Sequence, residues 1–231
     1  MIILTGDTHG EFERIEEFCA EYATTPDDVM VILGDAGVNY FLDERDVEKK
    51  ERLARLPITL FCVHGNHEER PEELPGYRER TWRGGVVLYE PDYPNLLFAQ
   101  DGEVYDFDGR KAIVMGGAYS VDKYYRLANG LPWFPSEQPD EAARARVEAA
   151  LERLDWRVDY VLSHTVPASY MPRHAFLPTI DQERVDNSTE AWLDTIERRL
   201  DYDAWYAGHF HVTESMGRVR LLYEDYEELE G

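Results

Sequence analysis

The stretch MIILTGDTHG at residues 1–10 joins a short apolar run to a Gly-Asp turn, and the chain then repeats that arrangement twice. VMVILGD at residues 29–35 has the same form, and ITLFCVHGNH at residues 58–67 ends its apolar run at His-Gly-Asn-His. Between these runs, residues 12–22 carry apolar side chains at helical spacing, and residues 43–56 read as a charged amphipathic helix. Strands that alternate with helices predict a parallel sheet with both faces covered.

The middle of the chain changes character. Short β-type runs separated by Pro, Asn, Asp and Gly predict antiparallel strands at residues 85–89, 96–99, 103–107 and 111–115. Asp108-Gly109 is the expected hairpin turn between the last two of these strands. Residues 116–138 read as a long irregular stretch rich in Gly, Pro and aromatic residues, and loops of that length are usually functional or disordered. The aromatic content favours order.

The last part of the chain returns to alternation. Helices are expected at residues 139–155 and 187–201, with a strand at 159–163 between them and a strand ending near Tyr206. Gly217 separates two final β runs. No internal repeat or linker is evident. The sequence therefore predicts an α/β fold in which residues 1–231 form a single domain, with two β-sheets and flanking helices.

The overall charge bears on partners. Lys and Arg number 24 against 47 Asp and Glu, which leaves a formal net charge of −23. Such a surface repels nucleic-acid phosphates and anionic lipid heads, so a nucleic-acid substrate is disfavoured. Solubility is the simplest explanation of the acidity. No pattern in the sequence indicates an oligomeric state.

Targeting and redox signals are sparse. No basic leader or long apolar run is present, so we expect neither a signal peptide nor a membrane span, and a cytoplasmic location. The only cysteines, Cys19 and Cys62, fall in a helical and a strand pattern. Both are predicted to be buried thiols, because two such residues make neither a disulfide framework nor a four-thiolate zinc site.

Five of the seven histidines share one setting: each lies just after an apolar run, with Gly, Asn or Asp close by. In an open parallel sheet, ligands gather outside the carboxyl ends of the strands, so these segments are expected to converge. The candidate metal ligands they provide are Asp7, His9, Asp35, Asn66, His164, His209 and His211.

The residue types indicate what such a cluster binds. Imidazole combined with carboxylate and amide oxygens suits Mn, Fe, Zn or Ni, with Mn our first expectation. The pairs Asp7/His9 and His209/His211 are each separated by one residue, which puts both side chains of an extended pair on one side. Seven ligands are enough for two metals bridged by one carboxylate. Metals about 3.5–4 Å apart can clamp a phosphoryl group and lower the pKa of a bound water to about 7.

The ordered motifs GD-x-H, GD, GNH-E, H and GH-x-H resemble those of the calcineurin-like metallophosphoesterase family, and they run from Asp7 to His211. The resemblance implies a two-sheet sandwich flanked by helices. It also implies that the first metal is held by Asp7, His9, Asp35 and His211. The second metal would be held by Asp35, Asn66, His164 and His209, with Asp35 as the bridge.

The same resemblance implies the catalytic roles. His67 would contact the phosphate and protonate the leaving oxygen, while hydroxide bridging the metals held by Asp35 and Asn66 attacks phosphorus in line. The expected activity is hydrolysis of phosphomonoesters or phosphodiesters. Glu68 has two readings: a carboxylate at a helix start that favours the helix dipole, or a catalytic group.

Two departures from the family pattern concern the substrate. Many members continue the second motif as GD-x-x-D-R-G, whereas Asn39 stands here at the second Asp and the Arg is missing. The Ser/Thr protein phosphatase branch has Arg where His64 precedes GNHE. Those arginines grip phosphate in forked pairs, so their absence weighs against a conventional protein phosphatase. Asn39 either contacts a ligand or substrate oxygen or forms the turn, and His64 is expected to be structural.

Replacement cations are available in two segments near the metal motifs. Lys123 and Arg126 lie among tyrosines, and Arg173 and His174 follow the fourth motif. We hypothesise that these segments form the rim of the substrate site; the alternative is that Lys123 and Arg126 pair with surface carboxylates. Two other classes of function stay open: an idle phosphoesterase-like scaffold that binds a partner protein, and a nuclease.

Overall fold

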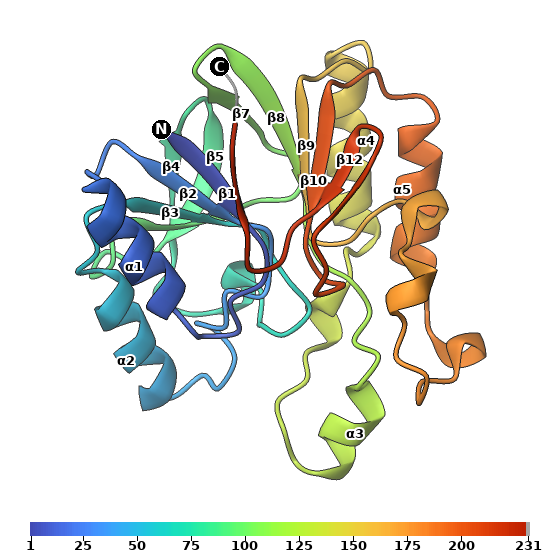
Figure 1. Ribbon diagram of the computed structural model, residues 1–231, viewed down its shortest axis with the longest axis horizontal. Coiled ribbons are helices and arrows are strands. Elements are labelled where there is room, and N and C mark those ends of the chain that lie inside the picture. The colour runs from blue at the N-terminus through green and yellow to red at the C-terminus, as the bar shows by residue number, and fades with distance from the viewer. Residues whose placement is uncertain (230–231) are drawn as a thin grey trace.

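The computed structural model describes residues 1–229, and in it two β-sheets pack face to face between two layers of helices (Figure 1). The larger sheet has seven strands in the described chain. From edge to edge they are β13 (Tyr226–Glu228), β1 (Ile2–Thr5), β2 (Val29–Ile32), β3 (Thr59–Cys62), β6 (Leu96–Ala99), β5 (Gly85–Tyr89) and β4 (Arg78–Trp82). The four central strands, β1, β2, β3 and β6, are parallel, and the outer ones are antiparallel to their neighbours.

The second sheet has six strands among the residues described. From edge to edge they are β11 (Glu214–Met216), β12 (Val219–Leu221), β10 (Ala204–Ala207), β9 (Tyr160–Ser163), β8 (Arg110–Met115) and β7 (Val104–Phe107). Its central strands β12, β10, β9 and β8 are parallel, and β11 and β7 are antiparallel edges.

The helices cover the outer faces. On one side lie α1 (Glu13–Tyr22) and α2 (Glu44–Leu53); on the other lie α4 (Glu141–Arg153) and α5 (Ser188–Glu197). The short helix α3 (Lys123–Ala128) projects from the edge where the strand ends meet (Figure 1). Single turns of 3₁₀ helix complete the chain: η1 (Pro71–Glu73), η2 (Pro135–Glu137), η3 (Ala168–Tyr170), η4 (Arg173–Ala175) and η5 (Gln182–Arg184).

Alternating side chains explain why each sheet is buried on both faces. Leu4 and Phe61 point between the sheets, where they meet Leu162 and other residues of the second sheet. Their neighbours Ile3 and Leu60 face α1 and α2 instead. Successive residues of a strand point to opposite faces, so a fully apolar strand of four residues serves both cores. The αββα sandwich expected from the sequence is confirmed.

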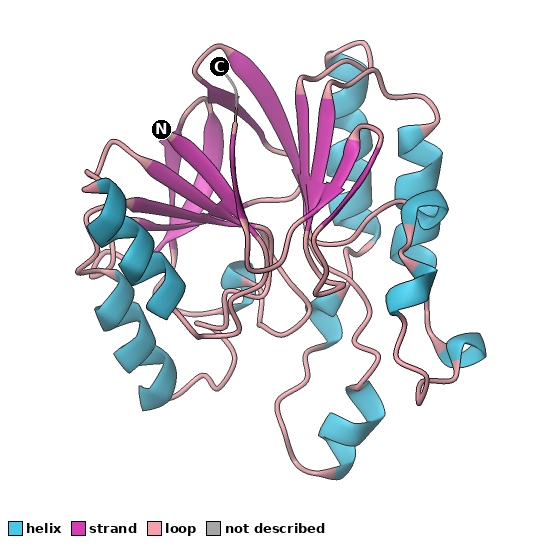
Figure 2. Ribbon diagram, in the orientation of Figure 1, coloured by secondary structure: helices cyan, strands magenta, loops and turns pink. Residues whose placement is uncertain are grey.

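The parallel strands bring their carboxyl ends together. The arrowheads of β1, β2 and β3 in one sheet and of β9 and β10 in the other point toward the same edge of the sandwich (Figure 2). The loops that leave these strands carry the motifs found in the sequence. Cys19 and Cys62 are free and buried, as expected. No helix among the described residues is long and apolar enough to cross a bilayer.

The expectation of four antiparallel strands in the middle of the chain is wrong in part. β5 and β6 are antiparallel, as are β7 and β8, but β6 runs parallel to β3 and β8 parallel to β9. The chain therefore crosses from one sheet to the other between β6 and β7. β6 is a central strand of its sheet, and all four of its residues are buried because both of its faces are covered.

Three of the described strands and α-helices were missed: β4, β13 and α3. β4 contains Arg78, Glu79 and Arg80, a polar run typical of an edge strand that faces water. The helix α3 lies inside the stretch expected to be irregular. Six residues are too few for a clear helical period.

Candidate metal centre and substrate pocket

Several candidate ligands lie just after the strand ends, in backbone conformations that are strained. His9, Asp35, His209 and His211 have φ of 50°, 51°, 68° and 52°, in the left-handed region that non-glycine residues rarely occupy. Such conformations cluster at functional sites, where the surrounding structure holds them. These left-handed residues turn the backbone sharply after each strand, so that side chains from neighbouring loops point into one space.

Two glycines of the motifs lie so close to the candidate ligands that there is no room for a side chain. A Cβ at Gly65 would lie 2.0 Å from Asp35 Oδ1, and a Cβ at Gly208 would lie 2.2 Å from Asp7 Oδ1. Neither space admits an atom, so any larger residue would displace the carboxylate. These glycines let loops of different strands approach within contact distance.

A first group of ligands contains Asp7, His9 and His211. His9 Nε2 and His211 Nε2 are 2.9 Å apart, and Asp7 Oδ2 lies 3.7 Å and 3.2 Å from them, respectively. Two ligand atoms bound at right angles to one metal, with bonds of about 2.1 Å, lie about 3 Å apart. The spacing of the three atoms therefore fits one divalent cation.

A second group contains Asp7, Asp35 and His164, all buried. His164 Nε2 lies 3.6 Å from Asp35 Oδ2 and 2.8 Å from Asn66 Oδ1. Asp35 Oδ2 is also 3.9 Å from His9 Nε2 of the first group. Asp35 therefore lies beside a histidine of each group, and Asp7 is a member of both groups.

Backbone groups fix which atoms are free to bind a cation. Asp7 Oδ1 accepts the N–H of His209 and Asp35 Oδ1 accepts the N–H of His67. His164 Nδ1 lies 2.8 Å from the carbonyl oxygen of Leu33, the geometry of an N–H donor that leaves Nε2 as a lone pair. Asp7 Oδ2 is buried without a hydrogen-bond partner. A buried carboxylate oxygen left unpaired fits a bound cation.

The pKa shifts of Asp7, Asp35 and His209 agree with this assignment. Burial acts to raise the pKa of Asp7, but the His211 ring, whose Nε2 is 3.2 Å from Oδ2, and the nearby His164 hold it below its usual value. The pKa of Asp35 is also lowered: burial opposes this, and His164, His67 and His9 outweigh it. Burial lowers the pKa of His209 to about 3, so its ring is neutral and able to bind a metal.

His67 lies beside the metal groups and is not one of them. Its ring meets the His9 ring edge to face at 5.2 Å. Its Nε2 is 3.8 Å from Asp122 Oδ1, a carboxylate from the segment before α3. Burial lowers the pKa of His67, and Asp35 and Asp122 act in the opposite direction.

A buried arginine supports Asn66 from behind. Arg126 Nη1 donates to Ser120 Oγ at 3.1 Å, and Asn66 Nδ2 donates to the same hydroxyl at 3.0 Å. With its amide nitrogen engaged, Asn66 presents Oδ1 toward His164. The chain of contacts from Arg126 through Ser120 therefore orients a candidate ligand.

The predicted substrate cations do not line the pocket, although their segments do. Tyr119, Val121, Asp122 and Met171 belong to those segments and contribute to the wall. The four residues themselves lie as follows. Arg126 is buried against Ser120, Lys123 Nζ lies 3.9 Å over the Trp133 ring, Arg173 is exposed, and His174 Nε2 is 3.4 Å from Glu214.

Three further residues of the motifs are buried. Asn39 accepts a hydrogen bond from Tyr77 Oη at 2.9 Å and does not line the pocket. His64 is enclosed, and burial lowers its pKa well below the usual value, so it is neutral. Glu68 does not start a helix; it accepts the backbone N–H groups of Gly65 and Gly37, which join the second and third motifs. Burial and Asp35 raise its pKa to about 7.

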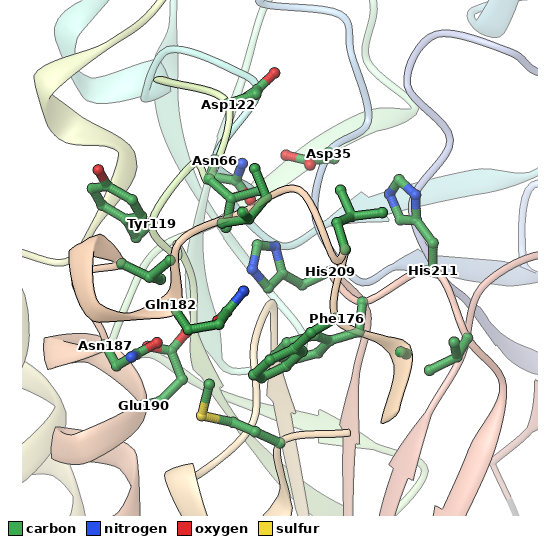
Figure 3. Close-up of a pocket in the computed structure, with 18 of the residues that line it drawn as sticks. Asp35, Asn66, Tyr119, Asp122, Phe176, Gln182, Asn187, Glu190, His209 and His211 are labelled. Atoms are coloured by element: carbon green, nitrogen blue, oxygen red, sulfur yellow. The ribbon is translucent and has the colours of Figure 1, made fainter. Parts of the chain in front are cut away.

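One cavity of about 480 Å³ is lined by seven of these residues: His9, Asp35, Asn66, His67, Asp122, His209 and His211. Figure 3 shows His209 at its centre, with Asp35 and Asn66 beyond it and His211 to one side. Gln182, Asn187 and Glu190 lie together on the opposite side. A cavity of this size suits a small molecule.

The family profile of calcineurin-like phosphoesterases matches residues 1–213. The chain belongs to this family. Its members are metal-dependent enzymes, so the protein is a phosphoric ester hydrolase, and the two Asp/His groups are where it could hold metal. The resemblance inferred from the motifs is confirmed.

Solved structures support the fold alone. TT1561 of Thermus thermophilus is 14% identical over 96% of this chain and 87% of its own, with a TM-score of 0.50. Phosphopantetheinyl hydrolase (PptH) from Mycobacterium tuberculosis is 18% identical over 96% and 87% of the two chains, with a TM-score of 0.41, too low to carry an argument. No curated protein matches the sequence.

Sequence reasoning did not single out Ser120, Asp122 or Glu190. Ser120 and Asp122 lie in the segment flagged for its cations, but nothing in the local pattern showed that they face Asn66 and His67. Glu190 sits in the first turn of α5, where a carboxylate has an ordinary role at a helix start. Their contacts join residues far apart in the chain.

Proposed function

We propose that this hydrolase cleaves phosphomonoesters or phosphodiesters with two divalent cations, Mn in the first instance. Asp7, His9, Asp35 and His211 would hold one cation, and Asp35, Asn66, His164 and His209 the other. The observation that carries the proposal is the position of Asp35 between two ligand groups, with His67 beside them. Both sheets supply ligands, which supports residues 1–231 acting as one catalytic domain.

Bound cations would supply an acidified water as nucleophile and neutralise the phosphate oxygens. The protein's own groups do the rest. His67 is placed to give a proton to the leaving oxygen, because its ring borders the pocket and its backbone is anchored to Asp35. Asp122 is placed to orient that ring and to favour its protonated form. Asn39, which stands where many members have Asp, offers no carboxylate for this task.

The experiment is metal removal and replacement on the full chain. Protein stripped with a chelator should be inactive, and Mn should restore hydrolysis of p-nitrophenyl phosphate or its bis-ester, with two metals bound per chain. Full activity in stripped protein would overturn the mechanism. Two bound metals with no turnover on either ester would favour the idle scaffold instead.

A protein phosphatase is a weaker candidate. None of the described residues that line the pocket is Lys or Arg. Acidic phosphopeptides would therefore meet no cation from the protein beyond the metal site. Faster turnover of a phosphopeptide than of any small ester would reverse this ranking.

A further inference from the structure

The cavity extends beyond the candidate metal ligands into a space with apolar walls. The segment between β9 and α5 supplies most of that wall, and Phe210 closes it beside His209. Its apolar members include Met171, Phe176, Leu177, Ile180, Val185 and Phe210. The rings of Phe176 and Phe210 are nearly parallel at 6.2 Å. Hydrolysis of a phosphate group alone needs no such space.

The far end of this extension is polar, and Glu190 dominates it. Figure 3 shows Glu190 beside Asn187, with the Gln182 side chain extending toward His209. Glu190 is only 3% exposed. Its Oε1 accepts the hydroxyl of Thr165 at 2.9 Å, while its Oε2 is buried without a partner.

An unpaired carboxylate oxygen in an apolar space is costly, because burial removes its water and no donor replaces the lost hydrogen bonds. Its position in the first turn of α5 explains a negative charge there but does not require an oxygen to be left without a donor. Thr165 already anchors the side chain through Oε1. A hydrogen-bond donor on a bound ligand would give Oε2 the partner that it lacks.

Charge excludes several ligand classes. Besides the metal-site carboxylate Asp35, the cavity is lined by Asp122 and Glu190, and the described wall has no Lys or Arg. With a net charge of −23, the protein repels any second anionic group on the substrate. The apolar wall likewise offers few partners to a sugar with many hydroxyls.

We propose that this extension binds the alcohol part of the phosphate ester, and that this part is uncharged, mainly apolar and carries an N–H or O–H group that donates to Glu190 Oε2. The inference rests on the proposed function, because it takes the phosphate to lie at the candidate metal site. It assigns the substrate class and makes Glu190 a specificity residue.

Binding of phosphonates tests the inference without turnover. In a phosphonate a CH₂ group replaces the ester oxygen, so the ligand cannot be hydrolysed. Calorimetry on the Mn-loaded full chain would compare ethylphosphonate, benzylphosphonate and 4-hydroxybenzylphosphonate. Benzylphosphonate should bind about tenfold more tightly than ethylphosphonate, because its ring is buried. The 4-hydroxyl should add about tenfold more by donating to a carboxylate.

Two variants and a control locate the effect. In Glu190→Gln the gain from the hydroxyl should fall to about twofold or less. Ala175→Phe, which fills the extension, should remove the preference for the benzyl group, with metal content and circular dichroism used to check the fold. The matched control is Glu183→Gln, an exposed carboxylate on the same segment, which should retain both preferences.

A second pair of ligands distinguishes compact from longer alcohols. Ribose 5-phosphate and inosine 5′-monophosphate share the same leaving hydroxyl, but only the nucleotide adds a flat ring with an N–H donor. A higher kcat/KM for the nucleotide, reduced in Glu190→Gln, assigns the extension to a longer heteroaromatic alcohol. A preference confined to the benzyl series assigns it to a compact one.

Either preference supports the inference, and the absence of both overturns it. Survival of the hydroxyl gain in Glu190→Gln would also overturn the role of that residue. The two proposals fail differently. Selective phosphonate binding without turnover contradicts only the proposed function, whereas turnover with equal affinities contradicts only this inference.

Discussion

The two sides of the pocket are built differently. The metal side rises from the ends of β1, β2, β3, β9 and β10, and its carboxylates are buried and held by backbone N–H groups. The opposite wall comes from residues 168–187, which contain only the single turns η3, η4 and η5 and are largely exposed. The proposed chemistry thus lies on strand ends and the proposed substrate choice on a loop, a division that would let one change without the other.

The largest expected effect is on the metal side, at the shared carboxylate. Asp35→Asn removes the charge that the proposal assigns to both cations, so metal content should fall toward zero and activity by about 10³-fold or more. Metal analysis and turnover on p-nitrophenyl phosphate measure both. Asp92→Asn, the same change at an exposed residue, is the control and should alter neither metal content nor activity. If Asp35→Asn kept two metals, the proposal that Asp35 bridges them would be wrong.

A smaller effect is expected at the proton donor. His67→Ala should keep both metals but lose about 10²–10⁴-fold in kcat, because only proton transfer is removed. The loss should be smaller for p-nitrophenyl phosphate, whose leaving group needs no proton, than for an alkyl ester. His174→Ala, whose side chain is 68% exposed, is the control. Loss of metal in His67→Ala would make it a ligand.

Asp122 lies beside His67, and the effect of changing it should be smaller again. Asp122→Asn should reduce kcat about tenfold through His67 while leaving KM and metal content nearly unchanged. The same change in a His67→Ala background should cost little, because there is no ring left to orient. Full additivity of the two losses would contradict the pairing.

On the loop side, the expected effect is on stability. Burial raises the pKa of Glu190 above the ordinary 4.5, so the folded state binds its proton more tightly than the unfolded state. Stability from this group is therefore present at low pH and is lost as the pH rises through the folded-state pKa. The Glu190→Gln variant should not lose stability in this way, because the Gln side chain does not ionise.

The Tm of metal-free Glu190→Gln should exceed that of the unchanged protein at pH 8, and the difference should shrink toward pH 4. Each kcal/mol gained corresponds to about 2–4 °C in a chain of this size. A lower Tm for the variant at pH 8 would show that Glu190 serves the fold through Thr165 and not ligand binding.

Much of the fold was predictable from local pattern. The runs before GDTHG, GDAG and GNHE are strands, with helices between the first three, and the seven candidate ligands converge as expected. The crossover after β6 was not predictable in this way, because antiparallel and parallel neighbours present the same short apolar runs. Lys123 and Arg126 were flagged for their charge, whereas the neighbours Ser120 and Asp122 make the contacts with Asn66 and His67.

The sequence by itself determined the set of candidate ligands, because each candidate follows a strand within a motif of a few residues and parallel strands end at one edge. Only the tertiary structure decided what surrounds that set. Asp122 meets His67, Arg126 supports Asn66 through Ser120, and Glu190 closes the far end of the pocket. The physical reason is distance along the chain: these contacts depend on how two sheets and a loop pack, and no local period records that packing.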